Sequence, residues 1–313
     1  MKITSMSNYA AEILKNHSEG HVHSVYRRTI NLTVGHHLLA IQAEGSPLSP
    51  ISLLTDVRSP ELSMTGIGPG YPFLITNSSL IFPEGTNLPL SGSAKADRKS
   101  SVPVSFGSAE IKDLFLPYAD EGTAGNGRID PAEDMQAALI KDIRQVLLNG
   151  SSDGFPGIFQ NAPEVEEDLI RMAAGSRIRA ASKAIRLGDP EEASRQLASL
   201  IGMGIGLTPS GDDFLCGILA GLRLLVKNKQ DQRSRLQDDL QRRIPGRLCR
   251  TNEISRAFLL CALEGQFSEP VINLTGRTNT KSINTMFNAI GHSSGRDTLC
   301  GIWYALTNSP SFR

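Results

Sequence analysis

A short polar motif occurs twice in the second half of the chain. The segment from Ser210 to Ile218 (SGDDFLCGI) returns 84 residues later as Ser294 to Ile302 (SGRDTLCGI), with seven of nine residues identical. Each copy follows a glycine-containing loop and precedes an apolar stretch, which predicts two helices with polar starts. A helix N-terminus carries about half a positive charge and unpaired N–H groups, so it favours anions.

We expect the two copies to form a pseudo-symmetric pair of helices whose starts face one pocket. Ser210 and Ser294 are predicted as N-caps, with Asp213 and Asp297 three residues later as in a capping box. A glycine at the first helical position would let a ligand approach the amides. The predicted substrate-binding residues are Thr208, Ser210, Gly211, Asp212, Asp213, Thr251, Asn252, His292, Ser293, Ser294, Gly295, Arg296 and Asp297. No catalytic group is assigned.

The two copies differ where Arg296 replaces Asp212, which suits an asymmetric polar substrate. Arginine binds carboxylate or phosphate through two parallel hydrogen bonds. Thr251 and Asn252 open an apolar, buried helix predicted over 252–264, so they are candidates for the pocket wall, although Thr251 as a simple N-cap explains them equally well. The competing hypothesis is that the repeat only packs two helices closely through small residues such as Gly217 and Gly301.

Motifs for bound cofactors are absent from the sequence. The glycines at 202–206 follow a predicted helix and lack the dinucleotide spacing, and no Walker lysine follows them. The four cysteines have no C-x-x-C spacing, so we expect reduced thiols. Adjacent Asp212 and Asp213 leave a metal-dependent hydrolase as a weaker alternative. We therefore expect no cofactor and no metal, including at the pairs His21/His23 and His36/His37.

The charge balance excludes several classes of partner. The chain has 313 residues, with 32 basic and 32 acidic side chains and a net charge of zero. A sequence-independent nucleic-acid binder needs excess positive charge. No apolar run has the length of a membrane span or of a signal peptide. We expect a cytoplasmic protein that binds neither nucleic acid nor membrane.

The periodicity of apolar residues changes part-way along the chain, which predicts an α+β fold. Short β-branched runs separated by turn residues indicate a mainly antiparallel β-sandwich or barrel-like domain over 1–125, and a helical period indicates an all-α domain over 126–313. The boundary is placed in the glycine-rich segment 121–130. The charged segment 227–243 is predicted as either a solvated connecting helix or a loop, and a plain exposed segment is favoured. Predicted strands cover 22–26, 30–34, 37–42, 51–55, 73–76, 102–106 and 111–115, and predicted helices cover 8–17, 131–147, 163–187, 190–201, 211–226, 252–264, 279–290 and 295–307.

The helical half resembles a known bacterial family. The segments 206–217 (GLTPSGDDFLCG), 251–255 (TNEIS) and 291–301 (GHSSGRDTLCG) are similar to the AllH-type subunit of oxamate carbamoyltransferase. The resemblance implies one component of a multi-subunit enzyme with FdrA-like and AllG-like partners. It also implies carbamoyl transfer between oxalurate and phosphate, giving oxamate and carbamoyl phosphate, in allantoin and purine catabolism. A non-catalytic interaction subunit is the alternative.

Overall fold

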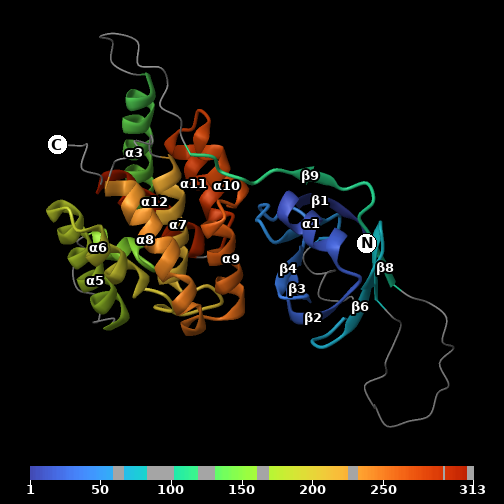
Figure 1. Ribbon diagram of the computed structural model, residues 1–313. Helices are drawn as coiled ribbons and strands as arrows, with labels where there is room; N and C mark the ends of the chain where they lie inside the picture. The colour runs from blue at the N-terminus through green and yellow to red at the C-terminus, as the bar shows by residue number, and fades with distance from the viewer. Residues whose placement is uncertain are drawn as a thin grey trace. The chain divides into compact units, whose positions relative to one another are not determined.

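The computed structural model describes residues 1–58, 67–82, 102–118, 131–160, 169–224, 232–291 and 293–308. The chain forms two compact units, Met1–Leu114 and Phe115–Arg313. The first is rich in strands and the second is helical, so the predicted α+β class is confirmed (Figure 1). The domain boundary predicted between 125 and 126 lies outside the described residues.

The first unit is built on one curled sheet. Its described strands run in the order β8-β7-β6-β2-β3-β4-β5-β1-β9, and all neighbours are antiparallel except β4–β5 and β1–β9. An isolated bridge between Lys2, which precedes β1, and Ser105 of β8 connects β8 back to the other side of the sheet, which makes the sheet barrel-like. The strands are β1 (Ile3–Ser7), β2 (Glu19–Tyr26), β3 (Thr29–Val34), β4 (His37–Gln42), β5 (Ser52–Thr55), β6 (Pro72–Ile75), β7 (Ser79–Phe82), β8 (Val102–Ser105) and β9 (Glu110–Lys112).

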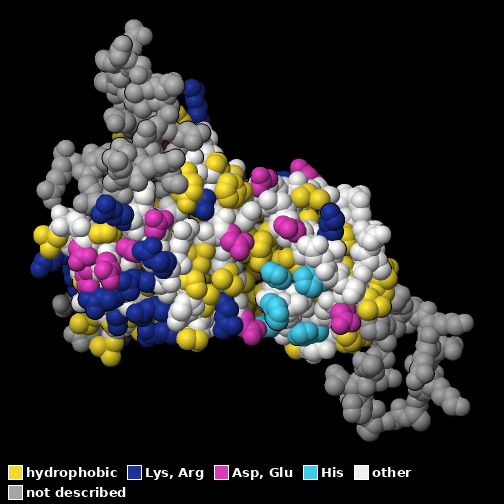
Figure 2. All heavy atoms as spheres, viewed as in Figure 1, with side chains coloured by type: hydrophobic (Ala, Val, Ile, Leu, Met, Phe, Trp, Pro, Cys, Tyr) yellow, Lys and Arg dark blue, Asp and Glu magenta, His cyan; other side chains and the backbone are white. Residues whose placement is uncertain are grey.

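Helix α1 (Asn8–Asn16) packs with the sheet of the first unit. It starts where the Ser7 hydroxyl accepts the Ala10 N–H at 2.9 Å. Its buried side chains Ile13 and Leu14 join the core formed by the strands. Histidine side chains gather on one face of this unit (Figure 2), where Tyr9 Oη lies 3.0 Å from His37 Nδ1. Over the described residues, no group of three or more His, Cys, Asp or Glu side chains is arranged to hold a metal ion.

The second unit consists of helices. None of the described helices is both long and apolar enough to cross a membrane. They are α3 (Pro131–Asn149), α4 (Pro156–Phe159), α5 (Leu169–Leu187), α6 (Pro190–Ala198), α7 (Ser210–Leu224), α8 (Gln232–Arg243), α9 (Glu253–Leu263), α10 (Glu269–Ile272), α11 (Thr280–Asn288) and α12 (Ser294–Thr307), with 3-10 helices η1 (Pro245–Arg250) and η2 (Asn273–Thr275).

The two copies of the repeat form the central helices α7 and α12, which pack against each other (Figure 1). A Cβ added at Gly217 would lie 2.0 Å from the Thr298 carbonyl oxygen, and one at Gly301 would lie 2.0 Å from the Phe214 carbonyl oxygen. The two contacts are equivalent, because Gly301 corresponds to Gly217 and Thr298 corresponds to Phe214 in the repeat. The predicted pseudo-symmetric, closely packed pair is therefore confirmed.

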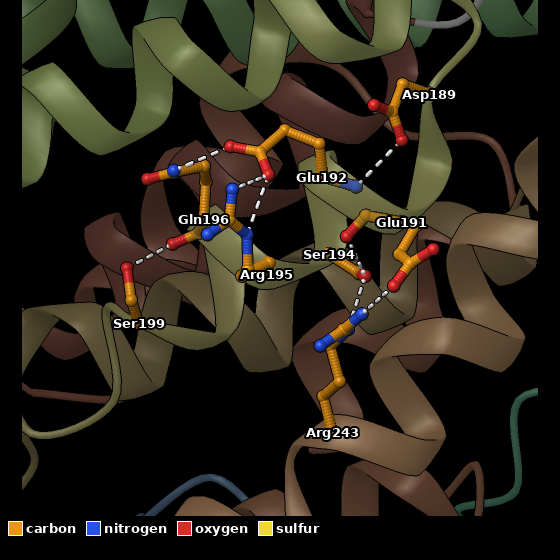
Figure 3. Close-up of polar contacts among 8 residues, drawn as sticks. All are labelled: Asp189, Glu191, Glu192, Ser194, Arg195, Gln196, Ser199 and Arg243. Carbon is orange, nitrogen blue, oxygen red and sulfur yellow. Dashed lines mark hydrogen bonds and ion pairs between the residues drawn. The ribbon is translucent and has the colours of Figure 1, made fainter.

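The part of the charged segment from 232 to 243 is a helix, which is one of the two predicted forms. The expectation of a plain exposed segment was wrong for these residues, because this helix contributes to the core. Helix α8 buries Leu236 and Leu240 and packs against α6. Two apolar residues four apart place one stripe on the core side of an otherwise charged helix. Arg243 of α8 donates to both Glu191 and Ser194 of α6 at 3.0 Å (Figure 3). This polar contact fixes the two helices side by side.

The start of α6 offers a simple test of the local structure. The Asp189 carboxylate accepts the Glu192 N–H at 2.9 Å, and Pro190 is the first helical residue (Figure 3). We expect Asp189→Ala to lower the free energy of unfolding by about 1 kcal/mol, because an N-cap is lost. Chemical denaturation followed by circular dichroism measures it. Asp238→Ala, at an exposed carboxylate within α8, is the control and should change stability by less than about 0.5 kcal/mol.

Candidate functional site

The starts of α7 and α12 meet, and they exchange polar contacts. The Ser294 side chain lies beside Asp213 and the Ser210 side chain lies beside Asp297, and each contact lowers the pKa of the aspartate concerned. Each serine therefore contacts the aspartate of the other copy. The four side chains form what we call the repeat junction: Ser210, Asp213, Ser294 and Asp297. The two helix starts therefore lie together as predicted, while the pocket that they were predicted to share stays a prediction.

The predicted N-caps are wrong. Ser210 and Ser294 are the first residues of their helices, and Ser293 precedes α12 as an N-cap residue without a side-chain capping bond. At α7 the Asp213 N–H is bonded to the Pro209 carbonyl oxygen at 3.3 Å. Capping within each copy is thus replaced by contacts between copies, because close packing of α7 and α12 brings the other helix within reach.

Both aspartates of the repeat junction are buried, at 6 % exposure for Asp213 and 0 % for Asp297. Loss of solvent raises the pKa of Asp297 to about 7, although the Phe155 N–H, Ser210 and Arg296 oppose the shift and Asp153 adds to it. Burial likewise raises the pKa of Asp213 well above its ordinary value, with Ser294 and Thr208 opposing and the Asp297 charge adding to it. The junction therefore retains protons near neutral pH.

The glycines after the two serines serve packing. They are the second helical residues, one position later than predicted. A Cβ at Gly211 would lie 2.1 Å from the Leu200 carbonyl oxygen, and one at Gly295 would lie 1.9 Å from the Phe287 carbonyl oxygen. The expectation that these glycines admit a ligand is wrong, because the preceding chain already occupies that space.

Asp212 turns away from the repeat junction toward α9. Its Oδ1 accepts the Gly202 N–H at 2.8 Å, and its Oδ2 accepts the Thr251 hydroxyl. Thr251 is therefore not the N-cap of α9, a role that Asn252 fills by accepting the Ser255 N–H at 3.0 Å. Asn252 also donates to the Leu207 carbonyl oxygen at 2.9 Å. These contacts hold the glycine-rich loop 202–208, which ends at Thr208, against the start of α9.

Arg296 points in a third direction. Its guanidinium donates to the Leu147 carbonyl oxygen at 3.1 Å, in the last turn of α3. A Cβ at Gly150 would lie 1.6 Å from Arg296 Nη1, so this glycine makes room for the guanidinium. A cation at a helix C-terminus is stabilising. Asp212 and Arg296, which occupy equivalent positions of the repeat, therefore bind two different neighbouring segments. The binding of an anion by Arg296 stays a prediction.

The segment 150–155 contacts the repeat junction at Asp297, although the sequence analysis did not single this segment out. The Phe155 N–H donates to Asp297 Oδ1 at 2.7 Å. Gly154 has φ +71°, and a Cβ there would lie 2.4 Å from the same oxygen. Gly150, Gly154 and the following Pro156 were the only sequence features that could have drawn attention to this segment. His292 lies outside the described residues, so its predicted role stays untested.

Both units of the chain contain a segment that matches a known protein family. Residues 200–306 match the family described as oxamate carbamoyltransferase subunit AllH, and residues 2–96 match the AllH family N-terminal domain. The chain belongs to the AllH family. The first match spans both copies of the repeat and the second covers most of the strand unit. The AllH name indicates a subunit of oxamate carbamoyltransferase, which implies partner subunits. No solved structure matches the chain.

Proposed function

We propose that this AllH chain takes part in carbamoyl transfer between oxalurate and phosphate, with FdrA-like and AllG-like subunits as partners. In this reaction a phosphate oxygen attacks the ureido carbonyl carbon of oxalurate and the bond from that carbon to the oxamate nitrogen breaks. The phosphate proton passes to that nitrogen, and the products are carbamoyl phosphate and oxamate. The family description supports this assignment.

We place the substrate at the repeat junction. The reciprocal contacts Ser210–Asp297 and Ser294–Asp213 carry this assignment, since they bring two helix starts and two hydroxyl groups together. Both helix dipoles favour negative charge there, and aspartates that retain protons do not repel an anion. Ser294 is half-buried, and residues 205–207 of the loop are exposed. We therefore place the entry of the substrate to the repeat junction on this side.

The chemistry needs hydrogen-bond donors of this kind. Attack on a carbonyl carbon passes through a tetrahedral oxyanion, and donors fixed in advance stabilise the charge where it develops. The side chains of Ser210, Ser294 and Thr208 each contact an aspartate of the junction, which fixes their positions. A protonated aspartate can donate to a hydroxyl oxygen, which leaves the O–H of that hydroxyl group for the substrate. The junction is therefore suited to the substrate's carbonyl oxygen.

A double substitution at the two serines tests this function. We expect Ser210→Ala with Ser294→Ala to lower carbamoyl transfer in the reconstituted complex by ten- to a hundredfold, because two donors are lost. Transfer of the carbamoyl group from carbamoyl phosphate to oxamate is the measurement. Ser268→Ala is the control, since Ser268 makes no capping bond at α10, and it should retain full activity. Unchanged transfer in the double variant would contradict the assignment.

A structural, non-catalytic subunit is the second candidate, and the glycine contacts between α7 and α12 favour it. Under that hypothesis the two serines matter only for stability. The double variant would then unfold more readily, by about 1 kcal/mol per hydrogen bond, while the complex kept its transfer rate. Measuring stability and rate on the same preparation separates the two candidates.

A metal-dependent hydrolase that uses Asp212 and Asp213 gains no support from the geometry. Asp212 is bound to Gly202 and Thr251, whereas Asp213 contacts Ser294 across the helix pair. The two neighbouring carboxyl groups thus have separate partners and do not present a common ligand set.

A further inference from the structure

The two aspartates of the repeat junction are each only partly satisfied by the protein. Asp297 Oδ1 accepts the Phe155 N–H, and Asp213 is contacted by Ser294 and Thr208. The Oδ2 atoms of both are buried and have no hydrogen-bond partner. A buried polar atom without a partner costs about 1–3 kcal/mol. Two such atoms at equivalent positions of the repeat therefore each lack a partner that a polar ligand group would supply.

The protonation state of the pair limits what that group can be. Burial and the mutual repulsion of Asp213 and Asp297 favour keeping a proton on the pair. A pair that shares one proton offers one O–H donor and one acceptor oxygen. A primary amide has the complementary groups, an acceptor oxygen and an N–H donor on the same carbon. A dicarboxylate or a fully ionised phosphate has acceptors only and leaves the acceptor oxygen of the pair unmatched.

We propose that Asp213 and Asp297 together bind a primary amide, with the protonated carboxyl donating to the amide oxygen and the other carboxyl accepting an N–H. The inference rests on the proposed function, because the amide is the carbamoyl group of the substrate or the amide of oxamate. A neutral carboxylic acid kept in a buried site is an established type of oxyanion-stabilising donor. The same O–H bond would thus strengthen as charge develops on the carbonyl oxygen.

The test compares oxamate with oxalate, which replaces the amide by a second carboxylate. Calorimetric titration uses the full chain, alone and in complex with the partner subunits. We expect the unchanged protein to bind oxamate at least tenfold more tightly than oxalate. Equal affinities, or no oxamate binding in either state, would overturn the inference. This comparison does not depend on any variant folding.

A double variant tests the assignment to the two residues. In Asp213→Asn with Asp297→Asn, the side-chain oxygens keep the contacts of the Oδ1 atoms, and an NH₂ group takes the place of each unpartnered Oδ2. The two Oδ2 positions then offer donors only. We expect oxamate affinity to fall at least tenfold while oxalate affinity is retained or rises. Asp238→Asn on α8 is the matched control and should preserve both affinities. An unchanged preference for oxamate in the double variant would refute the role of the pair.

The two levels of the hypothesis fail in different ways. If the unchanged complex transfers carbamoyl groups but shows no preference for oxamate, the amide-binding pair is wrong and the proposed function stands. If the unchanged complex neither transfers carbamoyl groups nor binds either ligand, the proposed function itself is wrong. Both measurements use the same preparation.

Discussion

Gly301→Ala is expected to destabilise the helical unit by about 3 kcal/mol or more. The new Cβ would lie 2.0 Å from the Phe214 carbonyl oxygen and 2.9 Å from the Ile218 nitrogen, both backbone atoms of α7. Backbone in a packed helix pair cannot yield without separating α7 from α12, and overpacking of this kind typically costs about 1–3 kcal/mol, sometimes more. Thermal unfolding should therefore begin several degrees lower. Gly217→Ala should have a similar effect, since it meets the Thr298 carbonyl oxygen in the equivalent contact.

The matched control for this substitution is Gly246→Ala. Gly246 belongs to the 3-10 helix η1 in the same unit, and no atom lies within 4 Å of the position its Cβ would take. Alanine there should leave stability unchanged or raise it slightly, because it restricts the unfolded chain. Equal stabilities for Gly301→Ala and Gly246→Ala would show that α7 and α12 do not approach each other as closely as described.

The close packing of α7 against α12 could be predicted because each copy of the repeat contains the residues that cause it. Small residues at Gly217 and Gly301, apolar neighbours and a polar start are all local features. Most strands of the first unit were predicted for the same reason, since their β-branched runs alternate. Strands β1 and β7 were not predicted. The first reads ITSMS with three polar residues, which gives no clear β-branched run.

The contacts of the individual site residues could not be predicted from local pattern. Ser210 fits a capping box within its own helix, and only the packing of α12 assigns it to Asp297 instead. The Phe155 N–H reaches Asp297 from 142 positions away in sequence. Arg296 was predicted as an anion-binding group because arginine binds carboxylate or phosphate through two parallel hydrogen bonds, yet its described partner is the carbonyl oxygen of Leu147. Long-range packing decides each of these cases.

Helix α8 shows the opposite limitation. Its composition, dominated by charged residues, favoured exposed chain, and only Leu236 and Leu240 among its described residues supply an apolar stripe. Two leucines give a weak periodic signal by themselves. Tertiary contacts with α6, including the bonds from Arg243, add what the local sequence lacks.

Asp297→Asn is expected to stabilise the protein at alkaline pH and to flatten part of its pH dependence. The pKa of this carboxyl rises from 3.8 in the unfolded chain to about 7 in the folded protein, chiefly through loss of solvent. Between these values the folded state holds a proton that the unfolded state has released, so stability falls as pH rises from about 4 to about 7. The full shift corresponds to about 4 kcal/mol. Asparagine carries no charge and keeps an oxygen for the Phe155 N–H, so it avoids this loss.

The measurement is the difference in the free energy of unfolding between variant and unchanged protein, at pH 5 and at pH 8. Other titrating groups largely cancel in that difference, but those facing Asp297 require attention: Asp213 from α7, Asp153 from the segment before α4, and Arg296 and Cys300 from α12 itself. Once Asp297 is neutral, the pKa of Asp213 is raised less because the like charge is removed. The variant then also loses less stability through Asp213 as pH rises, and this adds to the expected gain. A gain that is larger at pH 8 than at pH 5 is therefore the decisive result. A difference independent of pH would contradict the raised pKa of Asp297, and Asp213 alone would then hold the proton of the pair.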